Sequence, residues 1–165
     1  MLPIALDPTV LRIGLAGAGE GRATRLATLM AGGVEPMPVE ADAALTGLHL
    51  LFVAGLNKSL SAALAARARA QGILINVEDL PELCDFHMPA VVRRGDLALT
   101  VSTSGKAPGL SRLIREWLER AVGSEWSERL DNLANARSRW RAEGLSSSEV
   151  SRRIRDLVVR EGWLS

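Results

Sequence analysis

Asp79 is the residue whose place in the sequence best suits a catalytic group. It follows the apolar run at residues 73–77 and Glu78, and it precedes Leu80 and Pro81. The run has the length and composition of a buried strand, and open α/β sheets bind ligands beyond the carboxyl ends of such strands. A carboxylate placed there could act as a general base. Local rules alone favour the other interpretation, in which an Asp before Leu-Pro is a turn residue.

A second candidate is the glycine-rich segment "GLAGAGEGRA", where Gly17 and Gly19 match part of a dinucleotide-binding fingerprint. Such glycines allow a tight turn and a close approach of the backbone to a pyrophosphate at a helix N-terminus. The third small position, at which helix and strand pack, is expected to be taken by Arg22. An acid near the end of the second strand usually binds the ribose, and Glu40 or Asp42 lies at a suitable distance. Purely structural glycines and solvated loop acids would explain these residues equally well.

The loop "STSGKAPG", residues 102–109, is a third candidate because it is small, polar and followed by a helix. Backbone amides at that helix N-terminus, with Lys106 beside them, would suit an anionic group. Helix capping alone would also account for Ser102, Thr103 and Ser104.

The histidines and the cysteine indicate no metal chemistry. His49 and His87 lack the short spacings of zinc ligands, so we expect neither a metal site nor a catalytic histidine. Cys84 has no base next to it and is expected to be a small, buried or half-buried residue. As the single cysteine it cannot form an internal disulfide, which favours a reducing compartment.

The elements that would position these candidates alternate between strand and helix. Compact apolar runs predict strands, and segments with helical spacing of leucines or alanines predict helices between them. The expected strands are 10–17, 48–55 and 73–77, and the expected helices are 20–33 and 59–72. Ser59 is a plausible N-cap and Gly72 a stop for the second helix, whereas Pro36 and Pro38 weaken a strand at 34–40. This alternation predicts an α/β fold with a parallel, Rossmann-like sheet.

The pattern changes after Asp79. Two apolar runs joined by the turn tripeptide Arg94-Gly95-Asp96 predict an antiparallel hairpin, and residues 108–122 predict an amphipathic helix. Two further helices follow, and the second begins with a capping box at Ser146 and Glu149. A stripe that we expect to pack these two helices together comprises Trp126, Leu130, Leu133 and Trp140.

Composition narrows the range of partners. Lys and Arg total 20 against 19 acids, so the net charge of +1 favours neither nucleic acid nor a membrane surface. No apolar stretch approaches the length of a membrane span, and the start "MLPIALDP" has no basic segment or long apolar run. We therefore expect a cytoplasmic protein whose affinity for anions, if it has any, is local.

Two segments, "NVEDLPELCDFHMPAVV" and "VSTSGKAPGLSRLIREWLE", resemble the siroheme-synthase-type precorrin-2 dehydrogenase and sirohydrochlorin ferrochelatase family. The similarity runs from residue 11 to about residue 118. The resemblance implies a shortened Rossmann-like NAD-binding-type domain (1–85), a hairpin and helix for dimerisation and substrate contact (86–122), and a helical C-terminal subdomain (123–165). It also implies that the chain is a homodimer that oxidises precorrin-2, a tetrapyrrole, to sirohydrochlorin with NAD. Many members also insert ferrous iron, which is then a substrate.

The resemblance assigns roles to individual residues. Asp79 falls on the family's catalytic aspartate, Asn76 on an asparagine near the tetrapyrrole, and Thr103 on a hydroxyl in the substrate loop. The implied nucleotide-binding residues are Gly17, Gly19, Glu20, Gly21, Ala41 and Asp42. The implied substrate-binding residues are Asn76, Thr103, Ser104 and Lys106. The many carboxylates of the substrate would match a local basic set, namely Arg93, Arg94, Lys106, Arg112 and Arg115.

The chain departs from the family pattern in its first half. Gly17-Ala18-Gly19 and Arg22 stand where the family has three consecutive glycines and a small residue, and Thr24-Arg25 replaces an Arg-Lys pair. Gly55-Leu56-Asn57 replaces a Thr-Asp-type pair, and the connection from residue 39 to 49 is too short for the family's third strand. Two alternatives therefore stay open. One is a chelatase that does not use NAD, and the other is a non-catalytic tetrapyrrole-binding or partner protein.

Overall fold

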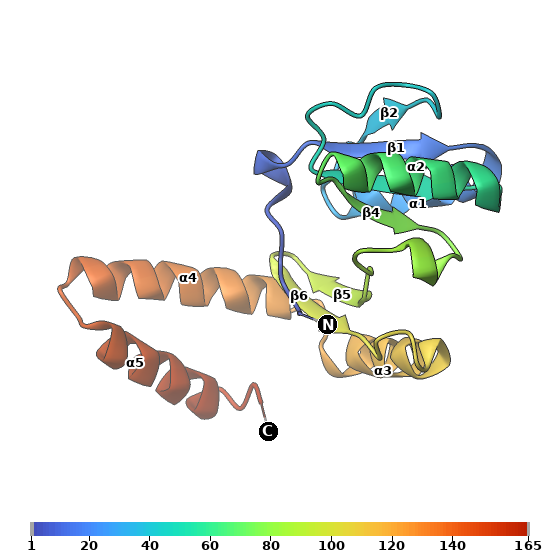
Figure 1. Cartoon of the computed structure of the whole chain (residues 1–165). Coiled ribbons are helices and arrows are strands. Elements are labelled where there is room, and N and C mark those ends of the chain that lie inside the picture. Colours follow the sequence, from blue (N-terminus) through green and yellow to red (C-terminus); the bar gives the residue numbers. More distant parts are fainter. Residues whose placement is uncertain (1, 165) are drawn as a thin grey trace. The chain divides into compact units, whose positions relative to one another are not determined.

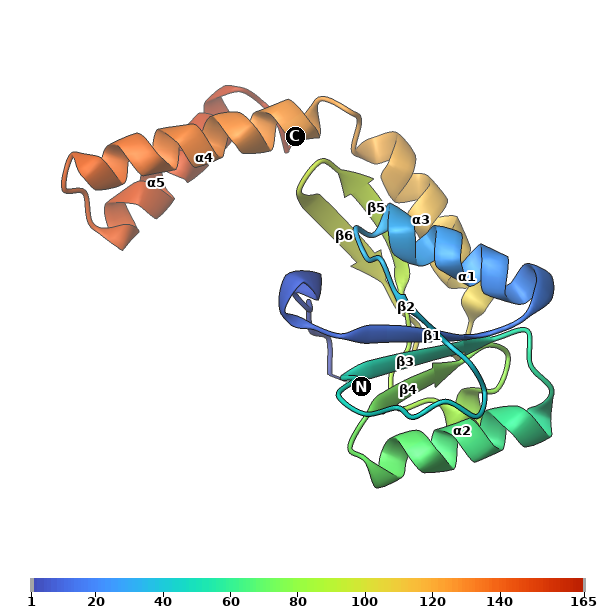
Figure 2. The ribbon, with the colours of Figure 1, turned by 90° about the horizontal axis from the view of Figure 1, so that it is seen from above.

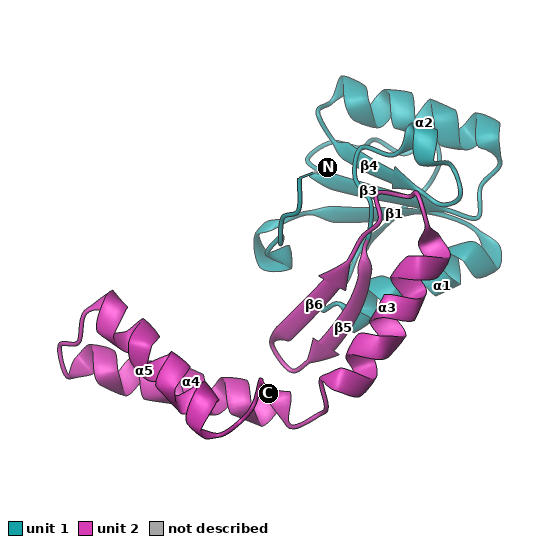
Figure 3. Ribbon diagram, turned by 90° about the horizontal axis from the view of Figure 1, so that it is seen from below, with its two compact units in different colours: residues 1–88 teal, residues 89–165 magenta. Residues whose placement is uncertain are grey.

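The computed structural model describes residues 2–164, which form two compact units that divide between residues 88 and 89 (Figure 3). Each unit has its own helices and strands and is described by itself below. The predicted division into three domains stays a prediction. No helix within residues 2–164 combines the length and the apolar character that crossing a membrane requires.

The first unit is built around a four-stranded sheet whose strands are all parallel. Its order is β2-β1-β3-β4, which is the Rossmann order with one strand missing beyond β2. After β2 the chain crosses to the other half of the sheet, so the switch point lies between the neighbouring strands β1 and β3. Open α/β sheets bind ligands at such a switch point. The strands are β1 (Ile13–Gly17), β2 (Met37–Val39), β3 (Leu50–Ala54) and β4 (Leu74–Val77).

Helices cover both faces of this sheet, as Figures 1 and 2 show for α1 (Gly19–Ala31) and α2 (Lys58–Ala70). Alternate residues of the strands point to opposite faces. Leu15 and Phe52 pack with Leu29 of α1, and Leu51 and Ile75 pack with helix α2. The predicted α/β fold with a parallel, Rossmann-like sheet is thus confirmed.

Pro38 is tolerated within β2 because this strand lies at the edge of the sheet, and Pro36 precedes the strand. It is short and pairs with β1 alone, with Pro38 opposite Leu15. A central strand would need the N–H that proline lacks, whereas an edge strand has one side that no neighbour uses. Residues 40–49, which follow, contain no helix or strand, in agreement with the short connection expected from the sequence.

The N-cap of α2 is Asn57, and the prediction that Ser59 takes this position is wrong. The Asn57 side chain accepts a hydrogen bond from the backbone N–H of Leu60 at 3.0 Å. The helix begins at Lys58, which places Ser59 inside its first turn. Asn is as good an N-cap as Ser, so residue type alone did not separate the two.

The second unit begins with the predicted antiparallel hairpin, formed by β5 (Ala90–Arg94) and β6 (Leu97–Val101). Helix α3 (Pro108–Ala121) packs against both strands. Arg94 joins hairpin and helix, since its guanidinium donates to the carbonyls of Glu119 at 2.9 Å and Val122 at 2.8 Å. These carbonyls lie at the C-terminal end of α3, where backbone acceptors lack helical partners.

Helices α4 (Trp126–Ala142) and α5 (Ser147–Arg160) form a helical pair (Figure 1). The predicted capping box is present at the start of α5. Hydrogen bonds from the Ser146 hydroxyl and backbone N–H lower the pKa of the Glu149 carboxyl. The four residues of the predicted stripe are half-buried, with Ala136 buried among them. Trp126 also meets Trp163, which follows α5, at 6.2 Å between ring centroids, and the guanidinium of Arg153 in α5 lies 5.6 Å from the ring centroid of Trp140 in α4.

Candidate functional site

Turns at the carboxyl ends of β1 and β3 touch through their backbones. The N–H of Ala18 donates to the carbonyl of Ala54 at 3.2 Å. A Cβ at Gly17 would collide with the carbonyl oxygen of Ala54, and a Cβ at Gly55 would collide with that of Ala18. Both glycines also have positive φ, at +145° and +69°. The two turns can approach this closely only because neither glycine carries a side chain.

Gly19 and Gly21 have different surroundings within the same turn. Gly19 has φ of +60° and no atom within 4 Å of a Cβ built on it, so space is open beside it. A Cβ at Gly21 would lie 2.9 Å from the backbone nitrogen of Gly55. Gly21 therefore takes the third small position of the fingerprint, where α1 packs closely against the turn after β3. The prediction that Arg22 takes this position is wrong. The fingerprint spacing is one residue shorter here than the Gly-x-Gly-x-x-Gly pattern assumes.

Glu78 brings a carboxylate into this turn. Its Oε2 atom accepts a hydrogen bond from the N–H of Gly55 at 3.2 Å, and it would lie 2.5 Å from a Cβ at Gly21. The side chain is half-buried. Sequence reasoning noted Glu78 only as the neighbour of Asp79 and missed its contact with the glycine turn. The available signal was its position directly after β4, at the same sheet edge as Gly55.

Asp79 lies just beyond β4, exposed and in the left-handed region at φ of +57°. Within residues 2–164, Ser104 at +53° is the other non-glycine residue with positive φ. Backbone strain of this kind gathers at functional sites, and Asp tolerates it better than most residues. Both residues were predicted as site residues from the sequence.

The loop that carries Asp79 is fastened to β4 by side chains. The Sγ atom of Cys84 accepts a hydrogen bond from the N–H of Val77 and donates to its carbonyl, each at 3.2 Å. Asn76 is buried, and its Nδ2 donates to the carbonyl of Phe86 at 2.9 Å. Cys84 is half-buried, as expected. These contacts hold both ends of the segment that contains Asp79, so its strained backbone has a rigid support.

Ala41 and Asp42 lie in the connection that follows β2, at the same edge of the sheet as the glycine turn. Glu40 and Asp42 are both exposed. Arg67 of α2 donates to the carbonyls of Ala41 and Ala43 and so fixes the course of this connection. The arrangement leaves the acids free to meet a ribose, as an acid after the second strand does in dinucleotide-binding folds.

The remaining predicted site residues belong to the second unit, in the loop between β6 and α3. The Thr103 hydroxyl accepts a hydrogen bond from the N–H of Ala107 at 3.2 Å and lies 3.1 Å from the hydroxyl of Ser111. Ser104 and Lys106 are exposed. Thr103 thus braces the loop from inside, while the side chains of Ser104 and Lys106 extend from it.

Most members of the predicted basic set have partners within the protein. Arg94 binds carbonyls at the end of α3, Arg112 pairs with Glu116 at 2.8 Å, and Arg115 pairs with Glu119. The hydrogen bond from Arg112 lowers the pKa of the Glu116 carboxyl. Within residues 2–164, Arg93 and Lys106 have no such ion pair, so these two are the better candidates for a substrate carboxylate.

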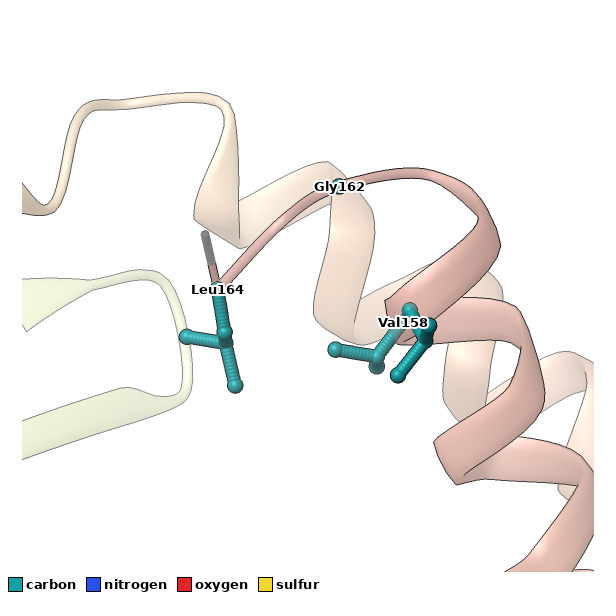
Figure 4. A pocket seen from close by; sticks show the side chains of 4 residues that line it. Val158, Gly162 and Leu164 are labelled. Atoms are coloured by element: carbon teal, nitrogen blue, oxygen red, sulfur yellow. The ribbon is translucent and has the colours of Figure 1, made fainter.

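Neither the histidines nor the apolar hollow near the C-terminus offers a second site. His49 accepts a hydrogen bond from the N–H of Arg12 at its Nδ1 atom, at 2.9 Å, which is a structural role. Within residues 2–164, no group of three or more His, Cys, Asp or Glu side chains could hold a metal ion. Figure 4 shows the hollow, whose lining residues carry no polar side-chain atoms: Val158, Val159, Gly162 and Leu164.

Two family models match this chain. Residues 26–90 match the model described as "Putative NAD(P)-binding", and residues 94–121 match "Sirohaem biosynthesis protein central". The first match contains Asn76 and Asp79 and begins after the glycine turn.

Curated relatives include siroheme synthases from several bacteria. The chain is 37% identical over 95 residues to that of Methylococcus capsulatus, and 40% identical over 101 residues to that of Ectopseudomonas mendocina. These alignments cover 58% and 61% of the chain, but only 20% and 21% of the relatives. The chain thus spans about a fifth of the length of the relatives it matches.

Among solved structures, the fold matches "SirC, precorrin-2 dehydrogenase" with a TM-score of 0.78. The match covers 100% of this chain and 93% of that one, at 17% sequence identity, and it shows the fold. The two family models and the curated relatives thus show that residues 26–121 are similar to siroheme synthase, with its NAD(P)-binding and central domains.

Proposed function

We propose that this protein is a precorrin-2 dehydrogenase of sirohaem formation, in which Asp79 is the base. The observation that carries the proposal is the Asp79 carboxylate itself, exposed at the carboxyl edge of the sheet on a strained backbone. It lies inside the segment that matches the NAD(P)-binding family. The names of the relatives, siroheme synthase and precorrin-2 dehydrogenase, supply the reaction.

The chemistry requires a base. Oxidation of precorrin-2 to sirohydrochlorin removes a hydride, and the cationic macrocycle that remains must lose a proton. Asp79 would take that proton, because its carboxylate is exposed and reachable from solvent. NAD supplies the hydride acceptor when it is bound.

The backbone of the β1–α1 turn fits a dinucleotide. Gly17 and Gly19 have the positive φ angles of a tight turn, and the space beside Gly19 is open to a pyrophosphate. Asp42 or Glu40 would bind the ribose hydroxyls, which favours NAD over its phosphorylated form. The shape of the backbone at this turn thus supports NAD binding. The nearby charges oppose it in part, because Glu20 and Glu78 are both acids at this turn.

Substrate binding is proposed for the residues that the family resemblance indicates. Lys106 would pair with a carboxylate of the tetrapyrrole, with Ser104 donating a hydrogen bond beside it. Thr103 would set the shape of the loop, because its hydroxyl already meets Ser111 and the N–H of Ala107. Asn76 would likewise set the shape of its loop, because its side-chain amide already donates a hydrogen bond to the carbonyl of Phe86.

A homodimer is the proposed assembly, with α3 as part of the contact. Leu110, Leu113 and Trp117 follow helical spacing on one face of α3, and they are 51%, 63% and 58% exposed. Ile114 and Leu118, on the adjoining side of the same helix, are partly buried within the unit. Large apolar side chains that gather on one exposed face are typical of a protein interface.

One observation favours a second candidate, a sirohydrochlorin ferrochelatase that does not use NAD. The Glu78 carboxylate lies against the turn that would hold the pyrophosphate. In this case Asp79 would remove the pyrrole N–H protons as ferrous iron enters the macrocycle. The two functions need the same base and differ in their use of the nucleotide.

Turnover assays on the purified chain separate these functions. With precorrin-2, the proposal predicts that sirohydrochlorin appears by absorbance only when NAD is added. With sirohydrochlorin and ferrous iron, the chelatase predicts sirohaem formation at the same rate with and without NAD. Binding of sirohydrochlorin without either reaction would contradict both and leave a tetrapyrrole-binding protein.

A further inference from the structure

We propose that Glu78 is a built-in anion of the nucleotide turn, and that its negative charge weakens the binding of a dinucleotide pyrophosphate there. This inference concerns the nucleotide side of the proposed function. It rests on contacts between three residues that are distant in sequence: Gly21, Gly55 and Glu78.

The carboxylate is fixed at the turn from two sides. Its Oε2 atom accepts the N–H of Gly55 at 3.2 Å, so the strand turn after β3 holds it. The same atom would lie 2.5 Å from a Cβ at Gly21, which means that it lies against the backbone of the first turn of α1. A side chain at Gly21 would expel the carboxylate, so the glycine leaves room for Glu78.

The position suits an anion, which is why Glu78 and a phosphate would compete for it. The N-terminus of an α-helix carries partial positive charge and N–H groups without helical partners, and it attracts phosphates and carboxylates alike. The N-cap of α1 is Ala18, whose side chain cannot satisfy those groups. Glu78 supplies the negative charge that the cap lacks.

A pyrophosphate at this turn would be repelled by the carboxylate of Glu78, whose charge no ion pair within the described residues neutralises. Within residues 2–164, Glu78 has no ion pair with Lys or Arg, and Glu20 adds a second acid in the first turn of α1. Like charges a few ångströms apart near a protein surface repel by roughly 1 kcal/mol or more. The nucleotide must therefore displace the Glu78 side chain or bind beside its negative charge. Either event lowers the affinity of the protein for the nucleotide.

The test compares two substitutions that each remove one negative charge. Glu78→Gln keeps the shape of the side chain and an oxygen that can accept the N–H of Gly55. Glu35→Gln makes the same change at an exposed residue in the loop between α1 and β2. The Kd values for NAD and for inorganic pyrophosphate are measured by calorimetry on both variants and on the natural chain.

Glu78→Gln is expected to bind both NAD and pyrophosphate about tenfold more tightly than the natural chain, and Glu35→Gln is expected to match the natural chain. Unchanged or weaker binding by Glu78→Gln, or no binding of either ligand by any of the proteins, would overturn the inference. The dehydrogenase proposal is judged separately, by turnover of precorrin-2. If only Glu78→Gln binds NAD, the inference stands and the dehydrogenase proposal fails.

Discussion

Two neighbouring carboxylates at the end of β4 have different surroundings and so are assigned different roles. Glu78 is half-buried and accepts a backbone N–H, whereas Asp79 is exposed on a left-handed backbone. The sequence predicted Asp79 as a site residue from its place after a buried strand together with the family pattern, although local rules alone favour a turn residue. It did not indicate the role of Glu78, because the hydrogen bond to Gly55 joins residues 23 positions apart.

Asn76 supports the loop that carries Asp79, and its removal is expected to destabilise the protein. In Asn76→Ala the partly buried carbonyl of Phe86 loses its donor, which costs about 1 to 3 kcal/mol. Urea unfolding followed by circular dichroism measures this loss. Asn132→Ala, at an exposed position of α4, serves as the control and is expected to unfold near the natural midpoint. Equal midpoints for both variants would show that the Asn76 contact contributes nothing.

At the scale of elements, the alternation of strand and helix was predictable, and details that depend on contacts were not. Apolar runs and glycine stops located β1, β3, β4 and their helices within a few residues. The N-cap at Asn57 and the packing role of Gly21 depend on where each helix begins, which residue types leave ambiguous. The strand β2 forms in spite of Pro38 because it has a neighbour on one side alone.

The contact between the turns after β1 and β3 predicts unequal effects of two glycine substitutions. Gly17→Ala would press a Cβ into the carbonyl of Ala54, whereas Gly19→Ala meets open space and pays only for its positive φ. We expect Gly19→Ala to cost about 1 kcal/mol and Gly17→Ala to cost several times more. Thermal unfolding of both variants measures the difference. A Gly17→Ala variant as stable as Gly19→Ala would be inconsistent with the close turn contact.

At the scale of the whole molecule, the chain combines a shortened nucleotide-binding sheet with a second unit of hairpin and helices. The near-zero net charge directs attention to local basic groups, and few of these are without partners in the structure. Arginines that looked like a substrate-binding set in the sequence largely serve helix ends and ion pairs. The contacts of Arg94 could not be predicted, because they join residues 25 and 28 positions apart, whereas Arg112 and Arg115 pair locally with residues four positions on.

The exposed apolar face of α3 predicts that the assembly depends on it. In Leu113→Asp a charge replaces an exposed leucine of that face, and we expect the dimer to dissociate into monomers. Light scattering coupled to gel filtration gives the mass. Val159→Asp, at a valine of α5 that is 72% exposed, is the matched control and should leave the dimer intact. A Leu113→Asp protein of unchanged mass would exclude this face from the interface.

The most direct test of the proposed function is the turnover of precorrin-2 by Asp79→Asn. Asn tolerates the left-handed backbone at this position, so the substitution removes the base and keeps the fold. With NAD at saturation, we predict that kcat for sirohydrochlorin formation falls by about 10² to 10⁴, while Glu82→Gln, at a nearby exposed acid, keeps the natural rate. Undiminished turnover by Asp79→Asn would contradict the assignment of Asp79 as the base.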